Sequence, residues 1–333
     1  MSKMEVTVLG TGVIGLMTAR LLQDRGSHVT LVSREYPNLT TSRAASGIML
    51  PTFPFPPESE EFSRRLRWQE ATLNFLRSYE GGRFLGTVRH TEFFSHGWVE
   101  GQVRSEGMLR YVNVKAPGVV RLKPSIMGFD EKVSFEMNFF PAHILLKRIY
   151  EEILENGAEH RIQEVDASFL DSPSGVIFNC SGYWSKSLCH DGEVNGVFGQ
   201  AVRFPPVGDI FSVGLGDYFA LSTEHWLYVG APFIPGMTDP RPQEEQFWKL
   251  VRFASNELAM FCEAAGTKYD PARLRPPVET AAGIRPYRKT GVRIEVTTSA
   301  RGMVVHNYGH GGHGWTIGWG AVVDAVNLWE AMV

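Results

Sequence analysis

"EVTVLGTGVIGLMTARLLQDRGSHVTLVSRE", residues 5–35, decides the fold class. Residues 5–9 and 28–33 are short apolar runs of the kind that forms buried strands. Between them, residues 16–23 repeat apolar side chains at helical spacing, and Gly26 ends that helix. The order strand, helix, strand within about 30 residues predicts a βαβ unit and an α/β fold of the Rossmann type.

The glycines of this unit predict a dinucleotide site. Gly10, Gly12 and Gly15 form the pattern G-x-G-x-x-G between the first strand and the helix. Gly10 permits a tight turn, Gly12 lets a pyrophosphate approach the backbone, and Gly15 lets the helix pack on the strand. The free N–H groups at the start of the helix then face the phosphates.

The end of the second strand leaves recognition of the ribose open. Glu35 suits the acid that binds ribose hydroxyls in such units. Arg34 beside it suits the 2′-phosphate of NADP, a pyrophosphate or an adenine ring equally well. An NADP-dependent reductase therefore stays a rival interpretation.

Two later segments favour FAD. "TTSRAASGIMLPTF", residues 40–53, offers hydroxyls and small side chains in a loop or turn that we expect to pass the cofactor's phosphates. "GVIFNCSGYWS", residues 175–185, leads from a buried strand at 176–179 into a turn at Ser181-Gly182. Taken alone, the first also fits an ordinary connector and the second a core strand with a tight turn.

Composition excludes several classes of function. The 333 residues suit one large domain or two interleaved ones. A net charge of −3 creates no field that recruits nucleic acid or an anionic membrane, and the sequence has no apolar run long enough to span a bilayer. Three cysteines fit no metal motif, and glycines separate His306, His310 and His313, so we expect no metal site.

Five segments, in order, resemble the D-amino acid oxidase family. They are "VLGTGVIGLMTARLL" (8–22), "LTTSRAASGIMLP" (39–51), "FNCSGYW" (178–184), "GIRPYRKTGVRIEV" (283–296) and "VVHNYGHGGHGWTIGWGAVVDAV" (304–326). The resemblance covers nearly the whole chain, and the last segment is the most specific.

The resemblance implies a Rossmann-type FAD-binding domain with a discontinuous second domain built on a mixed β-sheet. The first would comprise residues 1–50, 141–185 and 279–333, and the second, which binds substrate, residues 51–140 and 186–278. Residues 142–155 place apolar side chains on one face and predict a helix, and residues 241–265 predict another.

The glycine-rich stretch 306–320 belongs to the flavin in this interpretation. We predict a strand over 304–307 and a helix from Thr316 to about residue 332. The helix start carries partial positive charge, which would stabilise negative charge at the N1–C2=O edge of a reduced flavin. The resemblance puts the carbonyl of Gly312 on the substrate amine.

Arg285 is the predicted anchor for the substrate. A guanidinium binds a carboxylate through two parallel hydrogen bonds, and Pro286 restricts Arg285 to extended geometry. A surface arginine in a charged stretch is the alternative that the residues alone leave open. Relatives carry two pocket tyrosines, of which Tyr218 supplies one, while Phe219 is among the residues nearest to the second.

The full set of predicted contacts follows from the resemblance. For FAD it comprises Gly10, Gly12, Val13, Ile14, Gly15, Arg34, Glu35, Thr40, Thr41, Ser42, Ser46, Gly47, Ile48, Val165, Ser181, Gly182, Arg285, Gly311, Gly314, Trp315 and Thr316. For substrate it comprises Arg285, Gly312, Tyr218, Phe219, His313 and Met49, the last two at positions that are aromatic in many relatives.

The implied activity is an FAD-dependent oxidase that removes hydride from the α-carbon of a D-amino acid. The products are an imino acid, then a 2-oxo acid and ammonia, with hydrogen peroxide from dioxygen. Residues orient the substrate, and none acts as acid or base at the α-carbon. A glycine or secondary-amine oxidase and a flavin-binding protein without turnover are the alternatives.

The predicted partners are a small amino acid and dioxygen, and a homodimer stays open. The chain enters a strand almost at once, which leaves no room for a secretion signal. Its end lacks a Ser-Lys-Leu address. We therefore expect a cytoplasmic location.

Overall fold

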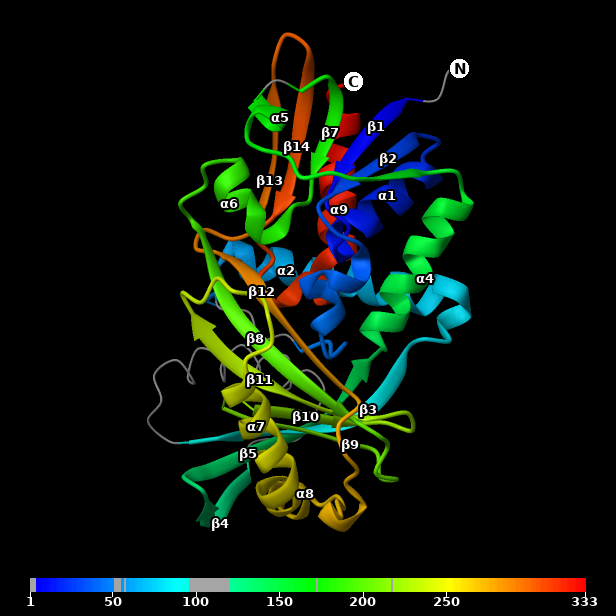
Figure 1. Cartoon of the computed structure of the whole chain (residues 1–333). Helices are drawn as coiled ribbons and strands as arrows, with labels where there is room; N and C mark the ends of the chain where they lie inside the picture. The colour runs from blue at the N-terminus through cyan, green and yellow to red at the C-terminus, as the bar shows by residue number, and fades with distance from the viewer. Residues whose placement is uncertain (1–3, 51–54, 57, 96–119, 172, 217) are drawn as a thin grey trace.

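The chain folds around two β-sheets that meet edge to face (Figure 1). This computed structural model describes residues 4–50, 55–56, 58–95, 120–171, 173–216 and 218–333. The first strand and the last helix of the chain belong to the part built on the first sheet. The second sheet lies below the first in the view of Figure 1.

The first sheet has six strands in the order β13-β14-β7-β1-β2-β6. Their bounds are β1 Glu5–Leu9, β2 His28–Ser33, β6 Glu159–Ile162, β7 Gly175–Asn179, β13 Arg293–Thr298 and β14 Gly302–Tyr308. All neighbours pair in parallel except β13 with β14. The order and the parallel pairing confirm the Rossmann-type α/β fold.

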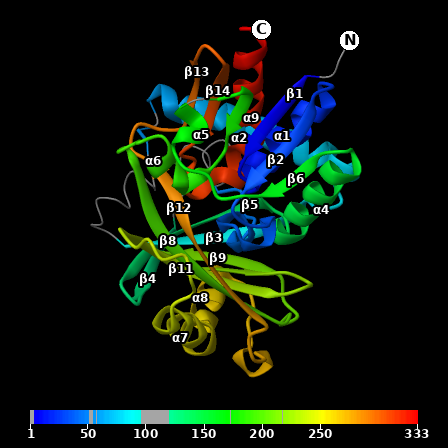
Figure 2. The same cartoon turned by 45° about the horizontal axis from the view of Figure 1, so that its top comes forward.

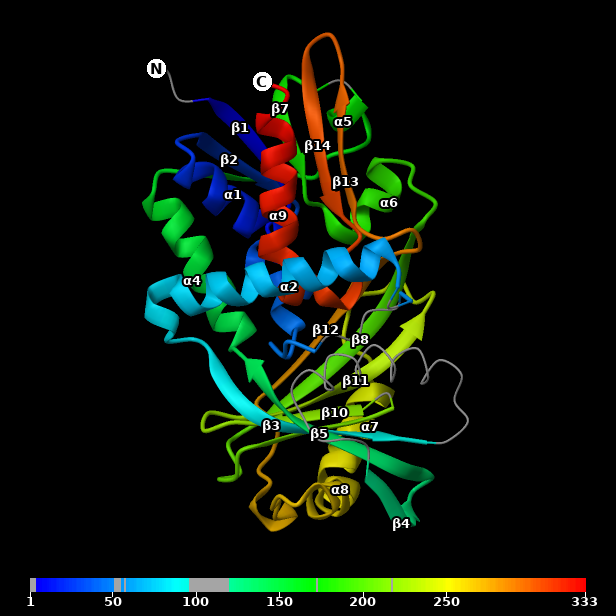
Figure 3. The same cartoon turned by 180° about the vertical axis from the view of Figure 1, so that it is seen from behind.

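Long helices cover one face of this sheet, and two short helices lie on the other face. They are α1 Val13–Asp24, α4 Ala142–Glu155, α9 Gly314–Glu330 and α2 Glu60–Ser78, with the short α5 Ser168–Asp171 and α6 Ser185–Leu188 between strands. The predicted helix over 142–155 is confirmed, and its buried residues join the core of the first sheet. Seen from behind, α2 lies across α9 (Figure 3).

The second sheet has eight strands in the order β12-β8-β11-β10-β9-β3-β5-β4. Their bounds are β3 Gly86–Phe94, β4 Val120–Ile126, β5 Phe129–Phe139, β8 Val194–Phe204, β9 Phe211–Leu215, β10 Tyr218–Ser222, β11 Leu227–Pro235 and β12 Glu279–Arg288. The sheet is mixed, because β3 pairs in parallel with β9 while the other neighbours are antiparallel.

Two helices cover the outer face of the second sheet (Figure 2). They are α7 Glu244–Arg252 and α8 Leu258–Ala265, joined by a π-helical turn over Phe253–Glu257. The predicted helix over 241–265 therefore begins later and is interrupted, and the turn buries Phe253 and Ala254 in the core beneath the sheet. The inner face is left to meet the first sheet.

The predicted domain boundaries stay a prediction. Two elements assigned to one predicted domain pack on elements of the other. Strand β12, placed in the FAD-binding part, pairs along its whole length with β8 of the second sheet. Helix α2, placed in the substrate part, packs on α9 through a cluster that contains Phe62, Trp68 and Ile317. Within the described residues, the structure contains no helix with the length and apolarity needed to cross a bilayer.

Candidate cofactor and substrate site

A cavity of about 980 Å³ lies between the two sheets. Its upper wall is formed by residues at or just after the carboxyl ends of four parallel strands, namely Leu9, Ser33, Cys180 and Asn307. Ligands of open α/β sheets bind at this edge, and the volume lies at the upper end of the range for small-molecule sites.

The turn after β1 fits a pyrophosphate. Gly10 has φ of +108°, and a Cβ on it would lie 2.6 Å from the carbonyl oxygen of Cys180. A Cβ on Gly15 would lie 1.9 Å from the oxygen of Gly10, so the helix packs on the turn only because both residues are glycine. Gly12, Val13 and Ile14 line the cavity, and Gly15 lies behind them.

Helix α1 presents its positive end to this wall. Gly12 is the N-cap residue and has no side chain to cap the helix, and the first turn holds no acidic residue. The N–H of Val13 donates to Ser42 Oγ at 2.9 Å, which ties the helix start to the hydroxyl-rich loop. An anionic phosphate is the ligand that such a helix end favours.

The far end of the cavity is lined by Arg34, Glu35 and Val165. The Arg34 guanidinium lies 4.0 Å from the centre of the Trp184 ring and 3.8 Å from the Glu35 carboxylate. Burial raises the pKa of Glu35, and the charge of Arg34 opposes that rise. The hydroxyl of Ser33 donates to the Glu35 carbonyl at 2.7 Å and so fixes the turn that presents the acid.

The loop after β2 runs along the cavity and connects both sheets. Its lining residues are Thr40, Thr41, Ser42, Ser46 and Ile48, while residues 51–53 of the segment lie outside the described part of the chain. Thr41 Oγ1 accepts from the N–H of Ile284 at 3.2 Å. Gly47 does not line the cavity; a Cβ there would lie 1.8 Å from the oxygen of Phe140, so glycine allows the two backbones to cross.

The turn at Ser181 and Gly182 closes the wall opposite this loop. Both residues line the cavity directly after β7. Ser181 Oγ donates to the side-chain oxygen of Asn179 at 2.6 Å. The late strand and its turn thus lie beside the cavity, where sequence placed them.

The glycine-rich segment after β14 forms the centre of the site. It turns through Gly311–His313, and α9 begins at Gly314, two residues before the predicted start at Thr316. The residues of this head that line the cavity are Gly311, Gly312, His313, Gly314, Trp315 and Thr316. The Trp315 indole N–H donates to the carbonyl of Ser42 at 2.9 Å, so the helix head and the hydroxyl loop hold each other.

Two buried polar side chains at this head lack partners within the described structure. They are Asn307, whose amide nitrogen and oxygen are both unbonded, and His310, whose Nε2 is unbonded. Both residues line the cavity, and both are at least 97% buried, with 0% and 3% of their surface exposed. Burial of unbonded polar groups is costly, so the wall fits a polar ring system with donors and acceptors such as an isoalloxazine.

Arg285 lines the cavity from the second sheet. Its Nη1 donates to the carbonyl of Phe198 at 3.0 Å, and its guanidinium lies 4.2 Å from the centre of the Phe233 ring. A Cβ on Gly199 would lie 2.1 Å from Nη1, so the guanidinium rests directly on the glycine backbone. These contacts fix the position of the guanidinium in the cavity wall.

Of the other predicted substrate residues, some line the cavity and one does not. Phe219 lines the cavity and packs toward Tyr228, with ring centres 6.2 Å apart. Tyr218 reaches the cavity rim, but its ring stacks on Phe253 at 4.8 Å in the core beneath the sheet. Met49 does not line the cavity, because its side chain is 2% exposed and lies in the core of the first sheet.

Several lining residues were missed at the sequence level. They are Glu92, Gly199, Tyr228, Tyr287 and Asn307. Tyr287 had a usable signal, since it lies two residues after Arg285 on one strand and therefore shares its face. Glu92 belongs to no motif, and only the pairing of β3 with β9 brings it to the cavity.

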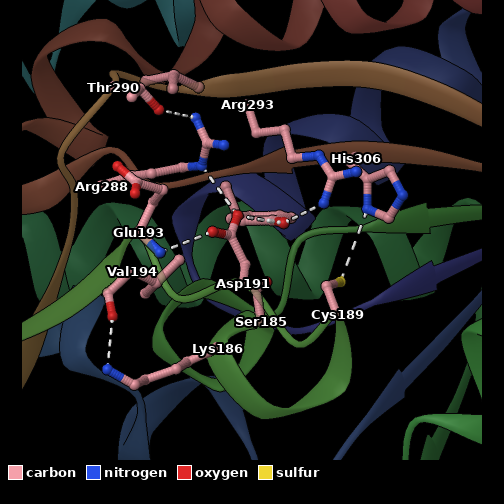
Figure 4. Close-up of polar contacts among 12 residues, drawn as sticks. Ser185, Lys186, Cys189, Asp191, Glu193, Val194, Arg288, Thr290, Arg293 and His306 are labelled. Atoms are coloured by element: carbon pink, nitrogen blue, oxygen red, sulfur yellow. Dashed lines mark hydrogen bonds and ion pairs between the residues drawn. The ribbon is translucent and has the colours of Figure 1, made fainter.

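A polar cluster behind the site fixes β12 to the first sheet (Figure 4). Asp191 accepts hydrogen bonds from Arg288 Nε and the Tyr308 hydroxyl, each at 2.9 Å, and Arg293 donates to Tyr308 at 2.7 Å. Burial alone would raise the pKa of Asp191, but these hydrogen bonds outweigh burial and lower it. The cluster thus ties the end of β12 to β13 and β14 of the first sheet.

Comparison with known proteins places these features in a family. The family model DAO, described as FAD dependent oxidoreductase, matches residues 5–106 and 143–323. The chain is 28% identical to a D-amino-acid oxidase of Rubrobacter xylanophilus, across 96% of this chain and 94% of that protein. It is 26% identical to a D-aspartate oxidase of Homo sapiens, across 98% and 95%. A glycine oxidase from Geobacillus kaustophilus shares the fold with a TM-score of 0.77 at 17% identity, across 99% and 95%.

Proposed function

The chain belongs to the DAO family of FAD-dependent oxidoreductases, and we propose that it oxidises the α-carbon–nitrogen bond of a D-amino acid. FAD is its cofactor, as the family and its glycine turn require. One observation carries the proposal: the Arg285 guanidinium and the glycine-rich head of α9 line the same cavity. The near full-length similarity to D-amino-acid and D-aspartate oxidases supports it.

The residues that would hold FAD follow the cavity wall. The turn at Gly10 and the start of α1 suit the pyrophosphate, and Glu35 suits the ribose. The head of α9 and Asn307 suit the isoalloxazine. Bound FAD would supply the acceptor for the hydride of the α-carbon, and its reoxidation by dioxygen would give hydrogen peroxide.

The chain's own contribution is orientation. Arg285 binds the α-carboxylate through two parallel hydrogen bonds, and its contacts with Phe198 and Gly199 fix the guanidinium plane. The Gly312 carbonyl accepts a hydrogen bond from the amine. Holding one face of the α-carbon toward the ring lowers the activation free energy by about several kcal/mol, as for other well-oriented reactants.

Anaerobic reduction of the bound flavin tests the proposal. We expect a panel of D-amino acids, and not their L-enantiomers, to bleach the flavin absorbance. Arg285→Lys should raise the substrate Kd about 100-fold, because one ammonium cannot reproduce a planar pair of hydrogen bonds. Arg241→Lys, at an exposed arginine paired with Asp239, is the matched control and should leave reduction unchanged.

Other results would overturn the proposal. Bleaching by glycine or N-methyl amino acids alone would make the protein a glycine or secondary-amine oxidase. A bound flavin that no amino acid reduces would make it a flavin-binding protein without turnover. The release of hydrogen peroxide on admission of air tests dioxygen as the acceptor.

A further inference from the structure

A buried carboxyl lies in the part of the cavity that belongs to the second sheet. Glu92 on β3 is 4% exposed and lines the cavity. Among the described lining residues of that sheet it is the acidic one, since Glu35 and Glu164 lie at the Val165 end. Burial of a carboxylate is costly unless a cation or hydrogen bonds compensate it.

A histidine holds this carboxyl in place. His90 Nε2 lies 3.0 Å from Glu92 Oε2, and His90 Nδ1 lies 2.8 Å from Ser212 Oγ. His90 is completely buried. A neutral ring satisfies both contacts when Ser212 donates to Nδ1 and Nε2–H donates to Glu92. The pair therefore orients the carboxylate without requiring a second charge.

A glycine opens the space beside the carboxyl. Gly214 on β9 is the neighbour of Glu92 in the sheet register, and a Cβ there would lie 2.0 Å from Oε2. Gly199 underlies the Arg285 guanidinium in the same way. Two side chains of opposite charge thus lie over two glycines that line one cavity. Between them lie the rings of Phe219 and Tyr228.

The register of the sheet gives the separation of the two groups. The chain of pairs Gly214–Phe219, Phe219–Gly230 and Gly230–Ala201 crosses three strand spacings, which is about 14 Å at roughly 4.8 Å each. Gly199 lies two residues from Ala201, about 7 Å along β8, so the two glycines lie about 16 Å apart. From its carboxyl carbon to its terminal nitrogen, an extended lysine or arginine measures about 8–9 Å by bond lengths. With a contact of about 3 Å at each end it spans about 14–15 Å.

We propose that the preferred substrates are D-amino acids with a cationic side chain, whose α-carboxylate binds Arg285 and whose terminal ammonium or guanidinium binds Glu92. The proposal rests on the proposed oxidation of D-amino acids. It explains why a buried acidic side chain lies in the same wall as Phe219 and Tyr228, and why a glycine lies beside it. Glu92 sets the choice of substrate and takes no part in the reaction at the α-carbon.

Isosteric substrate pairs test this with the holoenzyme. D-Arginine is compared with D-citrulline, and D-lysine with D-2-aminoheptanoic acid, by the rate of anaerobic flavin reduction divided by the Kd. We expect the cationic member of each pair to be favoured at least tenfold. Glu92→Gln should reduce that preference ten- to 100-fold, which is the value of a charge-assisted hydrogen bond. For the neutral substrates, the rate divided by the Kd should stay within about threefold of the wild-type value.

The control is Glu136→Gln, which makes the same change at an exposed residue on β5 of the same sheet. It should keep the wild-type preference. If Glu92→Gln does not bind FAD, the wild-type pairs still decide the matter. Neutral substrates equal to cationic ones in the wild type, or a preference that survives in Glu92→Gln, overturn the inference alone. Reduction by no D-amino acid of either kind overturns the proposed function with it.

Discussion

Glycines determine where the charged side chains of this site lie. The Arg285 guanidinium rests on Gly199 and the Glu92 carboxyl on Gly214, and in both cases a Cβ would lie about 2 Å from a side-chain atom. The atoms displaced would be the ends of flexible side chains rather than backbone. Substitution at these glycines should therefore move the charged group without unfolding the protein.

Gly199→Ala tests this at the arginine. A Cβ there would lie 2.1 Å from Arg285 Nη1 and 2.3 Å from Cζ, so the guanidinium must leave its position. We expect the substrate Kd to rise ten- to 100-fold while FAD affinity and the melting temperature stay the same. Flavin-reduction titrations and thermal melts give the three values.

Gly192→Ala is the matched control. A Cβ at Gly192 would meet none of the described atoms within 4 Å, so substrate binding should not change. Equal substrate affinity in both variants would show that the guanidinium does not bind the carboxylate from this position.

Tyr287 offers the hydroxyl that Tyr218 does not. It lines the cavity, and its hydroxyl lies 3.6 Å from the position a Cβ on Gly312 would take, beside Arg285. Tyr287→Phe should weaken substrate binding about two- to tenfold, the value of one hydrogen bond. Tyr36→Phe, at a tyrosine that is 53% exposed, should not. Unchanged substrate Kd values in stopped-flow reduction of the Tyr287 variant would exclude this contact.

At the scale of elements, helix α9 joins the glycine-rich head to the rest of the fold. Its middle crosses α2 so closely that a Cβ on Gly320 would lie 2.3 Å from Trp68 Cα and 2.8 Å from the Trp68 carbonyl oxygen. Trp68 Nε1 donates to Asp324 Oδ2 at 2.7 Å, one turn further along α9. Backbone atoms, unlike side-chain ends, cannot move aside locally.

The close crossing can therefore be tested by whether Gly320→Ala raises or lowers the free energy of unfolding. Helix propensity alone predicts that alanine stabilises α9 by about 1 kcal/mol. The crossing predicts the opposite, a loss of about 1–3 kcal/mol, as for other overpacked cores. Urea unfolding of the holoprotein distinguishes the two. Leu328→Ala, at a 38% exposed position of the same helix, should have little effect, and a stabilised Gly320 variant would contradict the close crossing.

The elements also show what the sequence predicts well. The strands at 5–9 and 28–33 agree with the structure to the residue, because their apolar runs and the glycine turn are local signals. The start of α9 was placed two residues late, since glycines hide a helix start. In the substrate part, the sequence selected both Tyr218 and Phe219, and both line the cavity, but the Tyr218 ring stacks on Phe253 beneath the sheet whereas Phe219 packs toward Tyr228. Adjacent residues of a strand face opposite sides of the sheet, so an error of one residue exchanges a side chain that faces the cavity for one that faces the core.

The eight-stranded order of the second sheet lay beyond sequence patterns. Strand β3 lies between β5 and β9, and β12 joins β8 after an excursion through α7 and α8. Such pairings depend on long-range packing rather than on local motifs. Glu92 enters the cavity only through this order, so no local pattern could have predicted it as a lining residue.

At the scale of the whole molecule, the part built on the first sheet buries two histidines in and just after β14. His306 and His310 are 4% and 3% exposed. Burial, with nearby arginine charge, lowers the pKa of His306 to about 4 and that of His310 to about 3. Both values lie far below the ordinary value of 6.5, so the folded state resists protonation at both rings.

This difference predicts how stability depends on pH. The unfolded chain takes up protons at these histidines as the pH falls through 6.5, whereas the folded chain does so only near pH 4 and 3. Stability is thus complete above pH 6.5 and falls below it, by up to about 1.4 kcal/mol per pH unit for each ring. Urea unfolding of the holoprotein between pH 7 and 5 measures the slope.

His306→Gln should remove about 1–2 kcal/mol of that loss in stability, because an amide at 306 takes up no proton. The exposed His225→Asn should leave the slope as it is. A slope in His306→Gln equal to that of the wild type would mean that the ring takes up its proton over the same pH range in the folded and unfolded chains, which contradicts the lowered pKa.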